Sequence, residues 1–172
     1  MEFRTERLTV RRIREDDHGD LRELWSALAE TEYARFDRPT DTSAEAVRLR
    51  IAKWASTAES TEHMFFAVCF AGKVIGYFAF HKREDGCETG YAFHPAYHGH
   101  GYAAESFAPL LTYLRGLGVR KVFAGTAAEN LPSVRFLEKT GFVRTGTETV
   151  SFYTDANGEP IRFEGAIYTL TL

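Results

Sequence analysis

The sequence has little that would place it in a membrane or in an oxidising compartment. Only two of its 172 residues are cysteines, Cys69 and Cys87, and they form no CxxC pair, which argues against a disulfide framework. The longest clear apolar run covers residues 64–71, far short of the roughly 18 residues that a membrane helix requires. The start of the chain is charged and has no apolar signal core. We therefore expect a cytoplasmic protein with no membrane partner.

An excess of basic residues is also missing. Lys and Arg total 21 against 24 Asp and Glu, a formal net charge of -3, whereas generic nucleic-acid binders are usually basic. We therefore expect no nucleic-acid partner. The five prolines are scattered and no internal repeat or linker occurs, so residues 1–172 are expected to form one domain. Aromatic residues are plentiful, with 14 Phe, 8 Tyr and 2 Trp, which is enough for a large core and an aromatic-lined pocket.

Hydrophobic periodicity predicts a mixed sheet with flanking helices. Apolar residues at helical spacing, such as Leu21, Leu24 and Leu28, give way along the chain to strand-like runs and turn signals. We predict an α/β (α+β) fold with a mixed, mostly antiparallel sheet of about seven strands and about four helices, including one right-handed parallel crossover. The expected strands are 7–13, 64–70, 74–81, 88–93, 121–126, 142–154 and 161–172; the expected helices follow 16–17, begin near 42–43, and span 102–117 and 132–140, with a loop over 31–40.

The loop 94–104 carries the strongest chemical signal. Gly99 and Gly101 frame the start of a predicted helix, and missing side chains let a ligand approach the backbone closely. The loop follows the first strand of the crossover, where ligands of such units gather. Because a helix start offers unpaired N–H groups and the positive end of the helix dipole, it favours phosphate. We therefore predict an anion site here, best suited to pyrophosphate.

Three other interpretations compete for this loop. The first is a simple glycine-containing turn before a helix. The second is a dinucleotide site, because residues 99–104 match the pattern G-x-G-x-x-A. The third is a metal site built on His94, His98 and His100. The dinucleotide interpretation is disfavoured because five residues separate Phe93 from the first glycine, and no acidic residue closes the next strand. The metal interpretation lacks an HExxH motif or a cysteine companion, so we expect no metal.

Four segments together resemble the GNAT superfamily of N-acetyltransferases. Residues 98–103, His-Gly-His-Gly-Tyr-Ala, resemble its acetyl-CoA signature Q/R-x-x-G-x-G/A, with His98 where Gln or Arg is usual. Residues 130–142 resemble its second motif, N-x-x-S-x-x-x-L-E-K-x-G-F. Residues 5–17 and the E-x-G-Y sequence at 88–91 are similar to the branch that acetylates the N-termini of ribosomal proteins. The resemblance covers nearly the whole chain.

The resemblance implies that an acetyl group passes from acetyl-CoA to a primary amine, either a protein N-terminus or a small molecule, by direct attack in a ternary complex. The glycine loop would hold the pyrophosphate, and the edge of the strand ending at Phe93 would pair with the pantetheine arm as an extra strand does. The residues implied in acetyl-CoA binding are Ala92, Phe93, His94, His98, Gly99, His100, Gly101, Tyr102, Ala103, Ala104, Asn130 and Ser133.

The resemblance also implies two catalytic residues. Glu88 is the candidate general base, acting directly or through water, although a glutamate beside a turn is also simply solvated. Ser133 would lie near the sulfur of acetyl-CoA. Asn130 would contact the cofactor, although a role as helix N-cap explains this asparagine equally well. Where many family members carry a tyrosine that protonates the thiolate, this chain has Leu137. An α-amine, with a pKa of about 7.7–8.0, needs far less help from a base than lysine at about 10.4.

The acceptor pocket is expected between the first two helices and the strands that follow. Its candidate walls are Tyr33, Phe36, Phe80 and Tyr91, while Trp25 is expected to pack in the core. Because Leu137 departs from the family pattern, a non-catalytic acyl-CoA-binding module is the alternative function. A covalent route through Cys87, expected in a turn, would need a histidine partner that the sequence does not show. The identity of the amine and the formation of a homodimer stay open.

Overall fold

The computed structural model describes residues 1–172 and is built on one eight-stranded sheet with the order β1-β2-β3-β4-β5-β6-β8-β7. All strand neighbours are antiparallel except β5 and β6. The strands are β1 (Glu2–Arg4), β2 (Leu8–Arg12), β3 (His63–Phe70), β4 (Lys73–Arg83), β5 (Gly86–Phe93), β6 (Lys121–Ala127), β7 (Val143–Thr154) and β8 (Pro160–Thr171). The α-helices are α1 (His18–Ala29), α2 (Ala44–Ala55), α3 (Tyr102–Gly116) and α4 (Leu131–Lys139).

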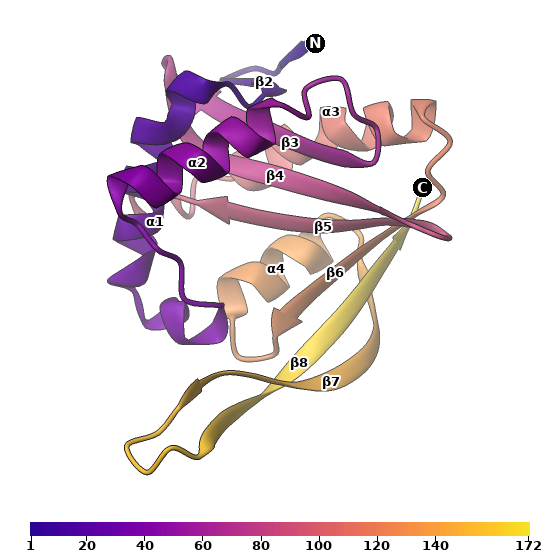
Figure 1. Ribbon diagram of the computed structural model, residues 1–172. Helices are drawn as coiled ribbons and strands as arrows, with labels where there is room; N and C mark the ends of the chain where they lie inside the picture. The colour runs from indigo at the N-terminus through magenta and orange to yellow at the C-terminus, as the bar shows by residue number, and fades with distance from the viewer.

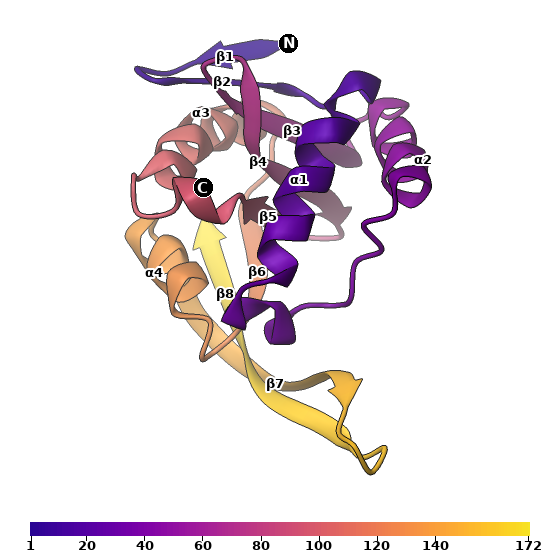
Figure 2. The same cartoon turned by 90° about the vertical axis from the view of Figure 1, so that its left-hand side faces the viewer.

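The predicted fold class is confirmed, with one strand more than the seven expected. The additional strand, β1, has only three residues, too few to show an alternating pattern. Figure 2 shows α1 and α2 on one side of the sheet and α3 and α4 on the other. None of the helices has both the length and the apolar character that crossing a membrane requires.

Two hydrophobic clusters fix these layers on the sheet. Under α3 and α4 the larger cluster includes Phe78, Phe107 and Leu114, all fully buried. Under α1 and α2 the smaller one includes Leu21 and Leu24, from the stripe that the sequence predicted. Each helix therefore lies where its apolar stripe meets an apolar face of the sheet.

The crossover from β5 through α3 to β6 leaves an opening in the sheet. The two parallel strands pair only at Cys87 with Val122 and at Glu88 with Phe123. Beyond these pairs the strands separate, as Figure 1 shows. The β6-facing edge of β5 after Glu88 therefore has no strand partner, and its backbone groups are free to pair with a ligand.

The C-terminal hairpin of β7 and β8 forms the edge of the sheet opposite β1, and β8 inserts between β6 and β7 (Figure 1). Its strands, near the turn that joins them, contact η2 (Glu32–Phe36), a short 3-10 helix within the segment predicted as a loop. The Phe36 and Phe163 rings pack edge to face at 5.1 Å between centroids, and the Tyr153 hydroxyl donates to the Ala34 carbonyl at 3.1 Å. These contacts hold η2 in place next to α1.

Both cysteines lie inside strands. Cys87 was expected in a turn, but it belongs to β5 and is 1% exposed. Burial raises the pKa of its thiol to about 11. Burial also raises the pKa of Cys69 in β3. Because the thiolate is the nucleophilic form, neither residue suits covalent acetyl transfer.

Candidate active site

A cleft of about 620 Å³ lies over the opening between β5 and β6. The end of β5, the loop after it and the first turns of α3 and α4 form one half, called here the cofactor half. The C-terminal part of α1, the segment 31–40, Tyr77 and Tyr153 form the other, called here the acceptor half. One continuous space therefore joins the helix starts to an aromatic pocket.

Backbone conformation gives the cofactor half its donors. Gly99 and Gly101 have φ values of +79° and +80°, a backbone conformation that residues other than glycine rarely adopt. Gly101 is the N-cap of α3, and the next three residues, all lining the cleft, are Tyr102, Ala103 and Ala104. The first N–H groups of a helix have no intrahelical acceptor. The loop predicted to bind an anion therefore ends in a set of free amides at a helix start inside the cleft.

The three loop histidines serve three different partners. His98 Nε2 lies 2.8 Å from the Phe93 carbonyl oxygen, and since that oxygen only accepts, Nε2 carries the hydrogen. His100 Nδ1 lies 2.8 Å from the carbonyl oxygen of His98, while His94 Nδ1 accepts from the Ala96 amide. His98 lines the cleft, but His94 and His100 do not. Nowhere do three or more His, Cys, Asp or Glu side chains gather as metal ligands.

An ion pair braces the glycine loop from outside the cleft. Arg7 donates to Glu105 of α3 at 2.8 Å and to the His100 carbonyl at 3.0 Å. Its guanidinium lies over the Tyr102 ring, 4.5 Å from the centroid. Burial by itself would raise the pKa of Glu105, but hydrogen bonds from Thr5 and Arg7 outweigh it and hold that pKa below its usual value. The start of α3 is thus fastened to the turn between β1 and β2.

Only every second residue of β5 turns its backbone N–H group toward the free edge. The His94 N–H donates to the Ile75 carbonyl of β4 at 2.8 Å, so it is not available to a ligand. Successive residues of an antiparallel strand turn their amides to opposite edges. The amides of Phe93 and Tyr91 therefore face the opening, while that of Ala92 faces β4. Of the three residues expected to pair with the pantetheine arm, Ala92 and Phe93 line the cleft and His94 does not. The free edge belongs to Tyr91 and Phe93.

A hydroxyl pair lies where the two halves meet. The Tyr91 hydroxyl and Ser133 Oγ, at the start of α4, are 2.6 Å apart, and both residues line the cleft. Burial raises the pKa of Tyr91 above its usual value, so the phenol keeps its proton at neutral pH. Leu137, one turn further along α4, is fully buried in the core and faces away from the cleft. Asn130 also lines the cleft, before the first turn of α4, and makes no side-chain cap bond.

Several predicted residues lie outside the cleft lining. Glu88 forms an ion pair with Arg83 and is not among the lining residues. Phe80 is fully buried in the core, and Phe36 is an anchor against the hairpin rather than a wall. Tyr33 does line the cleft, and so does Trp25, which also packs in the core.

The cleft also contains residues that sequence reasoning missed. Arg135 and Lys139 lie one turn apart on α4, and their helical spacing beside Ser133 was a readable signal. Asp37 and Arg38 follow η2, and no periodic pattern marks them. Tyr77 and Tyr153 come from strands far apart in the sequence, so only the fold brings them together.

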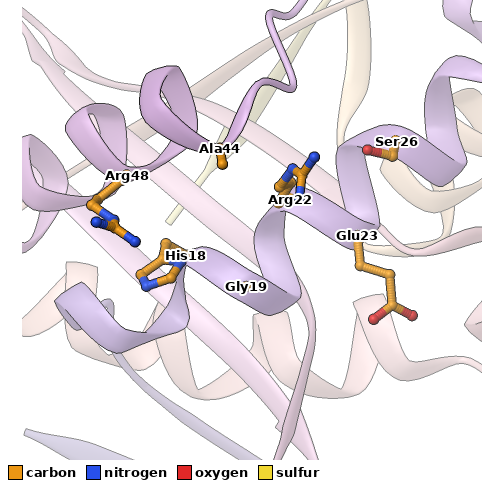
Figure 3. A pocket seen from close by; sticks show the side chains of 7 residues that line it. All are labelled: His18, Gly19, Arg22, Glu23, Ser26, Ala44 and Arg48. Carbon is orange, nitrogen blue, oxygen red and sulfur yellow. The ribbon is translucent and has the colours of Figure 1, made fainter.

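A second hollow lies between α1 and α2, away from the cleft. It has a volume of about 460 Å³, and Ala44 is the one hydrophobic residue among the seven that line it. Figure 3 shows Arg48 of α2 pointing toward His18 of α1, with Glu23 turned away. Glu23 is paired instead with Lys73 at 2.8 Å. No residue predicted for the site lies in this hollow.

Comparisons with known proteins identify the family and the fold of the chain. The uncharacterized N-acetyltransferase p20 of Bacillus licheniformis is 28% identical over 146 residues, covering 83% of this chain and 82% of the relative. The ribosomal-protein-S5-alanine acetyltransferase of Vibrio fischeri has a similar structure, with a TM-score of 0.81 at 17% identity, covering 99% and 96% of the two chains.

A ribosomal L7/L12 alpha-N-protein acetyltransferase, RimL, solved in complex with coenzyme A, matches with a TM-score of 0.81 at 15% identity, covering 100% of this chain and 98% of that one. At these identities the structural matches show the shared fold. The family profile described as "Acetyltransferase (GNAT) domain" matches residues 7–143. The chain therefore belongs to the GNAT acetyltransferase family and is an acyltransferase.

Proposed function

We propose that this acyltransferase moves an acetyl group from acetyl-CoA to a primary amine, a protein N-terminal α-amine or a small amine, by direct attack in a ternary complex. The single observation that carries the proposal is the continuity of the cleft, which joins free helix amides, a free strand edge, a hydroxyl pair and an aromatic pocket. The related RimL structure contains coenzyme A, which supports acyl-CoA as the donor.

The cofactor half fits coenzyme A along its length. The diphosphate would accept hydrogen bonds from the amides between Gly99 and Ala104. The pantetheine arm would pair with the β5 edge at Tyr91 and Phe93, which brings the thioester to Ser133. Arg135 and Lys139 add two positive charges on the α4 wall, suited to the remaining phosphate charge.

The chemistry needs few side chains. The neutral amine nitrogen attacks the thioester carbonyl carbon, the C–N bond forms and the C–S bond breaks, and the electron pair leaves on sulfur. The Tyr91–Ser133 pair would give the sulfur a proton, which water would then replace; the 2.6 Å contact between the two hydroxyls supports this role. Because Glu88 is held by Arg83 outside the cleft, we infer that water takes the proton released by the amine, directly or passing it on to Glu88.

The alternative of a non-catalytic binding module depended on Leu137. That side chain faces the core, so its identity does not remove a group from the cleft, and two hydroxyls are present there instead. RimL and the S5-alanine acetyltransferase, which are named for ribosomal proteins, share this fold, and that supports a protein N-terminal α-amine as the acceptor. An α-amine, partly neutral near pH 8, suits a site with a weak base.

A thiol-release assay tests the proposal. Purified protein is mixed with acetyl-CoA and amines that include peptide N-termini, and free coenzyme A is followed with a thiol reagent. Both protein cysteines are buried and contribute no background. Thiol release that requires an amine, with equal formation of acetylated amine, is expected. Tight binding of coenzyme A without thiol release for any amine would establish the non-catalytic module instead.

A further inference from the structure

The charged residues that line the cleft are separated into two groups. Arg135 and Lys139 belong to the cofactor half, where phosphate would meet them. In the acceptor half the charged residues are Asp37 and Arg38, both exposed at the end of η2. None of these four residues takes part in an ion pair of the structure. Asp37 is therefore the single carboxylate that this half offers.

The rest of the acceptor half is aromatic and held in place. Trp25 meets Tyr77 edge to face at 5.8 Å, and its indole N–H donates to the Tyr77 hydroxyl at 3.4 Å. Tyr153 is fixed through its hydroxyl to the Ala34 carbonyl. Burial raises the pKa of Tyr77. Asp37 lines the same cleft as Trp25, Tyr77 and Tyr153. Aromatic rings pack against the apolar part of a ligand, and their faces attract a cation.

Asp37 is the one acidic residue among those that line the cleft, so a second cation would find no further carboxylate on the lining. Outside the lining, Glu129 faces Arg35 at 3.7 Å. Arg38 would repel a further positive charge; its guanidinium lies 5.6 Å from the Phe152 ring. Each ammonium group that leaves water needs a compensating partner, so a polyamine or an aminoglycoside would leave most of its charges unpaired here.

We propose that the acceptor is a monoamine, a single ammonium group on an uncharged apolar or aromatic body, with Asp37 drawing in the ammonium and the Trp25–Tyr77 pair packing against the body. This inference rests on the proposed amine acetylation. It assigns Asp37 to recognition of the acceptor, while proton removal precedes attack at the thioester. N-terminal α-amines of neutral peptides and arylalkylamines share this chemistry.

The experiment compares four acceptors by thiol release: a neutral tripeptide amide, 2-phenylethylamine, spermidine and kanamycin. We expect at least one of the two monoamines to exceed both polycations in kcat/KM by about tenfold or more. Asp37→Asn should raise KM for the monoamine about five- to tenfold with kcat unchanged. The matched control is Glu32→Gln, an exposed acid on the same η2 that does not line the cleft, and it should change neither value.

The outcomes separate this inference from the proposed function. Thiol release that is as fast or faster with spermidine or kanamycin overturns the monoamine inference and leaves acetyl transfer intact. Equal losses in Asp37→Asn and Glu32→Gln overturn the role of Asp37. No thiol release with any of the four amines, despite binding of acetyl-CoA, overturns the proposed function and this inference with it.

Discussion

The two halves of the cleft are made of different parts of the chain. Backbone groups build the cofactor half, where two glycines at positive φ open a helix start and β5 leaves an edge free. Side chains build the acceptor half, and they come from α1, η2, β4 and β7. Backbone donors suit a diphosphate, which is the same in every molecule of coenzyme A. Side chains from separate segments suit an acceptor that varies between enzymes, because one fold can carry different sites.

The largest expected effect is on the backbone side. Gly101→Val puts a β-branched residue at φ +80°, which costs about 1–3 kcal/mol and turns the α3 amides away from the ligand. Calorimetry should show coenzyme A affinity reduced about 100-fold. Gly118→Val is the matched control, since it also has φ +80° but lies after α3, and it should lower stability with affinity unchanged. Equal loss of affinity in both variants would contradict a local role for Gly101.

A smaller loss of coenzyme A affinity should come from the charged side chains of α4, which would bind phosphate separately from the backbone amides of α3. The double substitution Arg135→Gln and Lys139→Gln removes two cations from the cleft wall. Coenzyme A should bind about tenfold more weakly, with less dependence on salt, because charged hydrogen bonds to phosphate are lost. Dephospho-coenzyme A, which lacks the 3′-phosphate, should lose less. A variant with unchanged coenzyme A affinity would show that α4 takes no part in binding phosphate.

The hydroxyl pair at the junction of the halves should affect turnover rather than binding. Ser133→Ala and Tyr91→Phe each break the 2.6 Å contact, and each should lower kcat about tenfold with coenzyme A affinity unchanged. The double variant should be no worse than the worse single variant if the two hydroxyls act as one unit. Additive losses, measured by steady-state kinetics, would mean that they act separately.

Glu88 should matter less than the motif resemblance implies. It is paired with Arg83 and lies outside the cleft lining, so Glu88→Gln should lower kcat less than about threefold. The pH profile of kcat/KM, measured with a neutral-peptide α-amine, should follow the amine itself in both proteins. A loss of 100-fold together with a changed pH profile would restore Glu88 as the general base.

The smallest expected effect concerns the cysteines. With a pKa of about 11, roughly one Cys87 thiol in a thousand is ionised at pH 8. The native protein should therefore not react with a thiol reagent at pH 8, and acetyl transfer should survive treatment with iodoacetamide. Reactivity should rise as pH increases toward 11, since the thiolate is the reactive form. Rapid inactivation at pH 8 would place a thiol in the reaction.

The extent to which the sequence predicts the site follows the same division. Gly99, Gly101 and Ser133 were predicted because local motifs specify a helix start, and the structure places all three in one cleft. The fold class and the apolar stripes of the helices were predicted for the same reason, since periodicity is a local signal.

The acceptor half was not predictable in the same way. Phe36 was expected to line it and is an anchor, because no local pattern shows that η2 meets the distant ring of Phe163. Tyr77 and Asp37 were missed because they come from segments far apart in the sequence, and only the fold brings both to the same cleft. Phe80 was expected as a wall, and a one-residue alternation along β4 decides that it faces the core instead.

Amide chemical shifts during titration with coenzyme A test the central claim most directly. If the helix start grips the diphosphate, the largest shifts will fall on the N–H signals of Gly101, Tyr102, Ala103 and Ala104, and the affinity from those shifts will match calorimetry. If these four signals stay in place while others move, for example around Arg22 and Arg48 in the second hollow, the account of the cofactor half is wrong.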